Sequence, residues 1–216
     1  MPTFVSFLAL KNESWTMQDE ILLSSLPPKR QTIVKKYTYE SDKRLSMYSV
    51  LLLSHMLQTH FHITDGLQDI LWENGKKPYL VSFPNIDFSY SHTSNAILCG
   101  VSSDGNIGVD LERCYNAPFE VMTFVFHPNE ISYVESFPYP EKTHAFFEIW
   151  TRKEAYTKEK GTGLICDLIS INTLSVPNAF FQKWEQDSYV CTAYQESQHP
   201  ISFEIVPEEM MLYHNT

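Results

Sequence analysis

The 216-residue sequence lacks three patterns that would each indicate a particular class of protein. It has no run approaching the roughly 18 consecutive apolar residues of a membrane-spanning helix, so we expect no membrane segment. Its four cysteines are widely separated and form no CxxC pair, which favours reduced core thiols over a disulfide framework or a zinc site. The apolar N-terminus has no basic region before it and no small-residue cleavage site, so it is interpreted as a strand and not as a signal peptide. A cytoplasmic protein is therefore expected.

Basic residues are also scarce relative to acidic ones. Lys and Arg number 16 against 26 Asp and Glu, and the formal net charge is −10. Nucleic-acid binding draws its affinity from a basic surface, so we do not expect a nucleic-acid partner. The basic residues that are present gather in short groups, near residues 29–36, 43–44 and 76–77, for which solvated helix faces are the ordinary interpretation.

The apolar pattern of the first half predicts one long helix and several short strands. The long helix is expected at residues 40–60, where apolar residues recur at helical spacing, with a shorter helix at 18–26. Turn signals then separate three short strands, which predicts an antiparallel meander. With the first strand of the chain, the expected strands are 3–9, 86–91, 97–102 and 107–112.

The second half repeats this arrangement. A long helix is predicted from 141 to 160 and ends at Gly161, a common helix terminator. Shorter helices are expected at 119–126 and 129–136, and strands near 169–175, 180–185, 188–194 and 201–206. We therefore predict an α+β fold of two similar halves, residues 1–105 and 106–216, each with a long helix on a small antiparallel sheet and related by a pseudo-twofold axis. A ligand cleft is expected between the halves.

The last strand of the meander places two carboxylates on one face. Side chains alternate along a strand, so Asp110 and Glu112 project together, and Gly108 on the same face leaves open space beside them. A third carboxylate, Glu154, lies on the apolar side of the second long helix. Three oxygen ligands suit a hard cation such as Mg²⁺. The ordinary alternatives are an exposed strand face and a surface pair of Glu154 with Lys158.

Five motifs follow one another in a fixed order. They are GKKP at 75–78, FSYSHT at 88–93, GVDLE at 108–112, FHPNE at 126–130 and WTRKEAYTKEKGTGL at 150–164. In this order the chain resembles the 4'-phosphopantetheinyl transferases, and in particular their long, pseudo-dimeric type, which includes the surfactin-synthetase-activating enzyme. The resemblance runs from Pro28 to Leu164.

The resemblance implies a magnesium-dependent enzyme of the holo-[acyl-carrier-protein] synthase type. Such enzymes transfer the phosphopantetheine arm of coenzyme A to a serine hydroxyl of an apo acyl or peptidyl carrier protein and release 3',5'-ADP. Asp110, Glu112 and Glu154 would hold Mg²⁺ against the pyrophosphate of coenzyme A. Glu154 would also be the general base, directly or through water, and Lys158 would lie near the scissile phosphate.

The resemblance also implies a set of residues that contact the phosphates of the nucleotide, together with Lys158. These residues are Lys29, Arg44, Lys77, Ser91 and His92. The neighbouring Lys76 is an alternative to Lys77. Glu130 matches the acidic residue of an FxxxE motif and is a possible additional metal ligand.

Two other functions use the same residues. A magnesium-dependent phosphohydrolase or nuclease could use the acidic cluster, although the negative net charge weighs against a nuclease. A non-catalytic carrier-binding protein could keep the fold, although retention of all three carboxylates and Lys158 weighs against it.

A carrier protein is expected to dock on an apolar surface, because this chain is acidic and carrier domains are typically acidic too. The hydrophobic segment at 118–126 follows the strand with the carboxylates and could supply Phe119, Met122 and Phe124 for docking. Packing of this segment in the core is an equally good interpretation. The protein is expected to act as a monomer.

Overall fold

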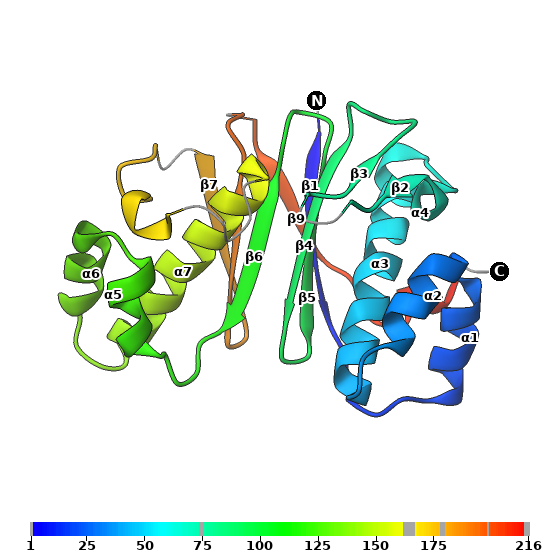
Figure 1. Ribbon diagram of the computed structural model, residues 1–216, viewed down its shortest axis with the longest axis horizontal. Helices are drawn as coiled ribbons and strands as arrows, with labels where there is room; N and C mark the ends of the chain where they lie inside the picture. Colours follow the sequence, from blue (N-terminus) through cyan, green and yellow to red (C-terminus); the bar gives the residue numbers. More distant parts are fainter. Residues whose placement is uncertain (1, 74–75, 162–166, 178–179, 198, 214–216) are drawn as a thin grey trace.

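The computed structural model describes residues 2–73, 76–161, 167–177, 180–197 and 199–213 (Figure 1). It confirms an α+β fold of two halves that lie side by side. Gly75 of the GKKP motif, residues 162–164 of the last motif and Cys166 lie outside the described residues. Within the part of the chain that the structure describes, no helix is both long and apolar enough to span a membrane.

The first half is a four-stranded sheet covered on one face by the long helix α3 (Glu40–Phe61). The strand order is β4-β5-β1-β9, with β1 Thr3–Ala9, β4 Asp87–Thr93, β5 Ala96–Ser102 and β9 Ile201–Ile205. The smaller elements of this half are α1 Met17–Ser25, α2 Pro28–Lys35, α4 Gly66–Asp69, β2 Ile70–Leu71, β3 Tyr79–Leu80 and α8 Met210–Tyr213. The apolar face of α3 packs on the sheet, where Leu52 and Met56 share a core with Leu8 and Phe88.

The second half is a three-stranded antiparallel sheet covered by the long helix α7 (Glu141–Lys160). The strand order is β6-β8-β7, with β6 Gly108–Arg113, β7 Phe181–Gln186 and β8 Tyr189–Tyr194. The smaller elements are η1 Phe119–Val121, α5 Met122–Val125, α6 Pro128–Glu135 and η3 Leu168–Ser170. Both long helices were predicted to within one residue at their ends.

The two sheets pack against each other, so the molecule has four layers from α3 to α7 (Figure 1). Val5 and Phe7 of β1 share a buried apolar cluster with Val109 and Leu111 of β6 and Ala193 of β8. This packing explains why the predicted three-strand meander is wrong at its last strand. The apolar residues of β6 are buried against the face of the first sheet, so β6 pairs with β8 and not with β5.

Two further expectations are wrong. The segment predicted as a strand at 169–175 contains the short helix η3 and a turn, because its backbone is held by side chains of other elements, described below. The division at residue 105 also fails at the C-terminus, since β9 returns to the first half and pairs in parallel with β1 from Thr3 to Phe7. The first sheet is therefore mixed and not purely antiparallel.

Strands β4 and β6 lie side by side at one edge of the stacked sheets and are joined by side chains. Successive side chains of β4 alternate, so Phe88 enters the core under α3 while the polar residues on either side of it face β6. The backbone N–H of Ile107 donates to Asp87 Oδ2 (2.7 Å), and that of Val109 donates to Ser89 Oγ (3.2 Å). We call this set of contacts between β4 and residues 107–112 the seam.

The backbone of α7 lies directly on β6 at Gly108. A Cβ atom at this position would lie 1.8 Å from the carbonyl oxygen of Ala155 and 2.6 Å from the amide nitrogen of Glu159. The space that the sequence suggested beside the carboxylates is thus filled by the helix backbone. This close approach brings the last two turns of α7 onto the strand that carries Asp110 and Glu112.

We predict that Gly108→Ala destabilises the protein by about 3 kcal/mol or more, because a backbone contact cannot relax as a side-chain contact can. Gly105→Ala is the matched control: nothing lies within 4 Å of its added Cβ, and only its φ of +96° is unfavourable. That control should cost on the order of 1–2 kcal/mol. Urea unfolding measures both, and equal losses for the two variants would contradict the close approach.

Candidate active site

Three side chains from three elements meet at the middle of the seam. Ser91 Oγ of β4 donates to Asp110 Oδ1 of β6 (2.7 Å). Lys158 Nζ, from the last turn of α7, donates to the same oxygen (2.6 Å) and to Ser91 Oγ (2.9 Å). The structure therefore brings together Ser91, Asp110 and Lys158, residues that are 67 positions apart at most.

Asp110 is buried, with 3% of its surface exposed. Its second oxygen, Oδ2, is also buried and has no hydrogen-bond partner among the described residues. An unpaired buried carboxylate oxygen is costly unless a further partner approaches it. Asp110 is therefore suited to bind one more cationic or hydrogen-bonding group.

Glu112 and Glu154 complete an acidic cluster around Asp110. Burial raises the pKa of Glu112 to about 7, and the negative charge of Asp110 contributes to the rise. Burial also raises the pKa of Glu154, again with a contribution from Asp110, while the charge of Lys158 opposes it. The negative charge of Asp110 therefore disfavours the ionised form of both glutamates.

These side chains suit a divalent cation by their chemistry but are not gathered around one point. Within the described ranges, no group of three or more His, Cys, Asp or Glu side chains is placed to hold a metal ion. The three carboxylates still offer the hard oxygen donors that Mg²⁺ prefers, and the free Oδ2 of Asp110 is one of them. Repulsion within the cluster would be relieved by a bound cation.

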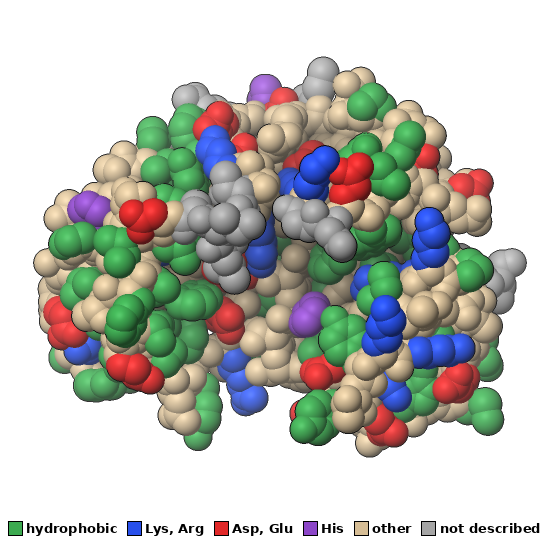
Figure 2. Space-filling model, viewed as in Figure 1, with side chains coloured by type: hydrophobic (Ala, Val, Ile, Leu, Met, Phe, Trp, Pro, Cys, Tyr) green, Lys and Arg blue, Asp and Glu red, His purple; other side chains and the backbone are tan. Residues whose placement is uncertain are grey.

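Two surface cavities lead from α2 towards the seam. A cavity of about 580 Å³ is lined by Lys29, Arg30 and Trp72, among others. A second cavity of about 170 Å³ is lined by Trp72, Tyr90 and Lys158, together with Pro78, Phe88 and Ser89. Trp72 lines both, so the two cavities adjoin. Figure 2 shows this face of the molecule, with basic side chains gathered over the half that contains α2.

The other expected phosphate-binding residues lie around the seam. His92 lies at the end of β4 with part of its side chain open to solvent, and desolvation by the surrounding protein, followed by the charge of Lys158, lowers its pKa. Lys77 donates to Asp87 and to the backbone oxygen of Ile107 (2.7 Å), so its ammonium group already has partners at the start of the seam. Lys76 instead forms an exposed pair with Glu73.

Sequence reasoning missed several residues that shape the site. The guanidinium carbon of Arg30 lies over the ring of Trp72, 5.3 Å from the ring centroid. Arg30 also donates to the backbone oxygen of Ser46 (2.6 Å). Asp87 and Ser89 hold the backbone of β6. The alternation of polar residues along β4 indicates one polar face. It does not indicate that this face packs against a second sheet.

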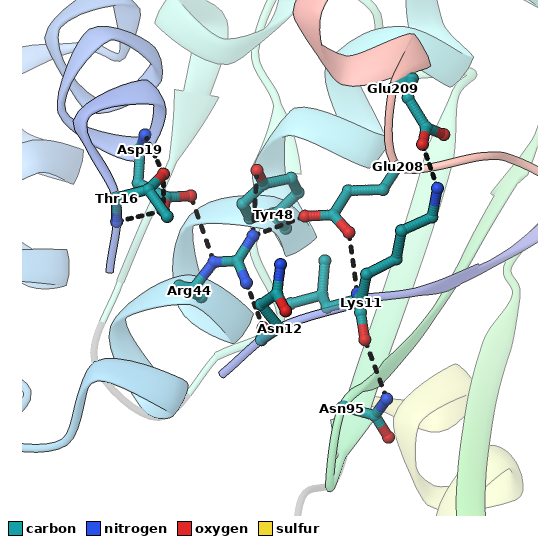
Figure 3. A network of polar contacts seen from close by, with 10 residues as sticks. Lys11, Asn12, Thr16, Asp19, Arg44, Tyr48, Asn95, Glu208 and Glu209 are labelled. Carbon is teal, nitrogen blue, oxygen red and sulfur yellow. Dashed lines mark hydrogen bonds and ion pairs between the residues drawn. The ribbon is translucent and has the colours of Figure 1, made fainter. Parts of the chain in front are cut away.

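Arg44, which was expected to contact the phosphates, is held by protein groups in the structure (Figure 3). Its guanidinium is buried and donates to Asp19 Oδ1 (3.2 Å), to the backbone oxygen of Asn12 and to Glu208. Figure 3 shows these partners converging on it from α1, from the loop after β1 and from the C-terminal segment. A buried guanidinium group needs carboxylate partners, and Arg44 has two, Asp19 and Glu208. Through Glu208, Arg44 holds the C-terminal segment against the first half.

Glu130, the possible additional metal ligand, lies in a buried network of protein groups. Its side chain is fully buried, and Oε2 lies 2.8 Å from Lys153 Nζ and accepts a bond from the His127 N–H at the start of α6. Its Oε1 accepts from the N–H and the hydroxyl of Thr173 (2.8 and 2.6 Å). Lys153 Nζ also donates to Leu168 O (2.9 Å), so this network holds the segment that was predicted as a strand.

We predict that Glu130→Gln lowers the free energy of unfolding by about 3–5 kcal/mol, because a buried ammonium group loses its carboxylate. Glu135→Gln on the same helix is the control, since Glu135 forms an exposed pair with Lys142 that should contribute less than about 1 kcal/mol. Urea unfolding gives both values. A Glu130→Gln protein of normal stability that had lost metal affinity would restore the ligand role.

The segment after β6 is only partly in the core. Met122 is buried, with 4% exposed, and Phe119 packs edge-on against Phe146 at a centroid distance of 5.5 Å. Phe124 is 75% exposed. Of the three residues expected to dock a carrier, Phe124 alone therefore presents most of its side chain to solvent.

Comparison with known proteins identifies the family. Residues 13–103 match the family model "4'-phosphopantetheinyl transferase, N-terminal", and residues 106–204 match that of the "4'-phosphopantetheinyl transferase superfamily". Together the two models cover most of the chain, which therefore belongs to this superfamily.

The relatives that match indicate the Sfp-like type. The chain is 26% identical over 155 residues to a 4'-phosphopantetheinyl transferase of Bacillus subtilis, which covers 72% of this chain and 68% of the relative. It is 28% identical over 160 residues to the 4'-phosphopantetheinyl transferase gsp of Aneurinibacillus migulanus, covering 73% and 65%. It is 21% identical over 183 residues to the 4'-phosphopantetheinyl transferase Sfp of Bacillus subtilis (strain 168), covering 85% and 77%.

Proposed function

We propose that the protein transfers the 4'-phosphopantetheine arm of coenzyme A to a serine hydroxyl of an apo carrier protein, with release of 3',5'-ADP and in dependence on Mg²⁺. The meeting of Ser91, Asp110 and Lys158 beside two further carboxylates supports this proposal most directly. The names of the relatives support the same reaction. The product would be a holo-carrier, as in the holo-[acyl-carrier-protein] synthase reaction.

Coenzyme A would lie along the two adjoining cavities. Lys29 lies at the rim of the larger cavity, Trp72 lines both, and Lys158 lies at the end near the seam. Cations at both ends suit a ligand with a 3'-phosphate and a pyrophosphate. His92 is exposed near Lys158 and, with its lowered pKa, is neutral at physiological pH and able to donate one hydrogen bond to a phosphate oxygen.

Magnesium would be held by Asp110, Glu112 and Glu154. Their oxygen donors fit the preference of the ion, and the free Oδ2 of Asp110 is available to it. When bound, the ion would neutralise charge on the pyrophosphate, which is the main requirement of phosphoryl transfer.

Glu154 is the proposed general base. It would take the proton of the carrier serine, whose oxygen forms a bond to the phosphorus on the pantetheine side of the pyrophosphate. The bond from that phosphorus to the bridging oxygen breaks, and 3',5'-ADP leaves. A raised pKa makes the Glu154 carboxylate a stronger base than an exposed one. Lys158 would stabilise the charge that develops on the 5'-phosphate of the leaving 3',5'-ADP, once its ammonium group faces the ligand.

The test is a mass measurement on an apo carrier after incubation with the protein, coenzyme A and Mg²⁺. We expect the carrier to gain the mass of one phosphopantetheine arm, and chelation of the metal to abolish the gain. Carriers from fatty-acid, polyketide and peptide synthesis, run in parallel, define the carrier class. Cleavage of coenzyme A without labelling would favour a phosphohydrolase, and binding without either reaction would favour a carrier-binding protein.

In the same assay Glu154→Gln should lower the rate on the order of 10²–10⁴-fold, because a general base is lost. Glu148→Gln, on the same helix, is the control, since Glu148 pairs with Lys183 (3.2 Å) away from the acidic cluster. Its rate should stay within about twofold of the wild type, as for other surface pairs. Unchanged labelling by Glu154→Gln would remove Glu154 as base and ligand.

The carrier would dock on the exposed part of the segment after β6. Phe124 is the exposed aromatic residue there, and aromatic residues dominate the binding energy of many interfaces. We also propose that the protein acts as a monomer in the cytoplasm; its described cysteines, Cys99, Cys114 and Cys191, are free thiols, as a reducing compartment requires.

We predict that Phe124→Ala raises the KM for the carrier on the order of tenfold and leaves the KM for coenzyme A unchanged. Ile21→Ala, which removes a side chain that is 57% exposed on α1, should change neither value. Steady-state kinetics with each substrate varied in turn decides the matter. An equal effect on both KM values would mean that Phe124 supports the site itself and does not contact the carrier.

A further inference from the structure

Lys158 places a single positive charge inside the acidic cluster. Its Nζ lies 2.6 Å from Asp110 Oδ1 and 2.9 Å from Ser91 Oγ, and Ser91 donates to the same carboxylate oxygen. Its position in the last turn of α7 is fixed by the close contact of that helix with Gly108. The ammonium group is therefore a built part of the seam and not a mobile surface charge.

The charge of Lys158 acts on all three carboxylates. It is paired with Asp110, and it favours the ionised forms of Glu112 and Glu154 against the effect of burial. Without it the cluster would hold three like charges, each raising the free energy of the others. Lys158 thus performs, for the protein alone, the neutralising task that a divalent cation would perform.

We propose that Lys158 is the built-in counter-ion of this cluster, and that Lys158 and a divalent cation compete for Asp110. The inference rests on the metal site of the proposed function and adds a coupling to it. A cation bound by the carboxylates releases the ammonium group from Asp110, and the released group can then bind an anionic group of a ligand. The unpaired Oδ2 of Asp110 can bind the cation first, while Lys158 still donates to Oδ1.

This competition lowers the affinity of the protein for a divalent cation. The wild-type protein alone should bind a divalent cation weakly, because binding must break the pair between Lys158 and Asp110. An anion that attracts Lys158 should strengthen cation binding, since the anion and the cation both favour the state in which Lys158 is released from Asp110. Metal and phosphate ligand would then bind cooperatively without any movement of the backbone.

The first test is calorimetric titration of Mn²⁺ into the protein without coenzyme A. Lys158→Met should bind Mn²⁺ about tenfold more tightly than the wild type, because the competing charge is gone and the side chain keeps a similar shape. Lys158→Arg should bind like the wild type. Lys160→Met is the matched control, since Lys160 pairs with Glu196 outside the cluster and should leave the affinity unchanged.

The outcomes distinguish the competition by Lys158 from the metal site itself. Equal or weaker binding by Lys158→Met overturns the competition while leaving the metal site in place. Absence of Mn²⁺ binding by every protein removes the metal site itself and the competition with it. Binding by Lys158→Arg as tight as by Lys158→Met also overturns the proposal, because a retained charge should still compete.

A second test needs no variant and so does not depend on folding of Lys158→Met. The wild-type protein is treated briefly with acetic anhydride, with and without Mn²⁺, and acetylation of each lysine is measured by peptide mass spectrometry. Lys158 should react faster with Mn²⁺ present, because its amine is released from Asp110, while Lys160 serves as the internal reference. Equal or slower reaction of Lys158 would overturn the proposal.

Discussion

The side-chain seam between β4 and β6 is the constraint on which the site depends. Two stacked sheets leave edge strands with unpaired backbone N–H groups, and a buried N–H group needs an acceptor. Asp87 and Ser89 accept from Ile107 and Val109, so the two strands are fixed side by side without a backbone ladder. The next polar residue on that face, Ser91, then meets Asp110. The same contacts that join the halves therefore build the centre of the site.

The buried carboxylates of this protein are of two kinds, one that stabilises the fold and one that belongs to the candidate active site. Both oxygens of Glu130 accept hydrogen bonds, and its charge is matched by Lys153, so it stabilises the fold and has no capacity left for a ligand. Asp110, by contrast, has a free buried oxygen, and Glu112 and Glu154 have raised pKa values. Unmatched charge in a cluster is typical of a functional site.

The long helices and most strands could be predicted because their patterns are local. The periodicity of α3 and α7 and the terminating Gly161 depend on neighbours in sequence alone. The predicted strand at 169–175 failed because bonds from Glu130 and Lys153, distant in sequence, decide its backbone. The partners of Arg44 could not be predicted for a similar reason, since Glu208 lies near the other end of the chain.

The sequence alone determined the α+β class, the placement of Asp110 and Glu112 on one strand face and the identity of the family. These follow from side-chain alternation and from the order of motifs, which folding does not alter. Only the tertiary structure decided that β6 leaves the meander, that α7 fills the space at Gly108 and that Lys158 is held by Asp110. Each of these depends on which surfaces exclude water together and on which charges are buried together, and such contacts join residues that the linear sequence keeps apart.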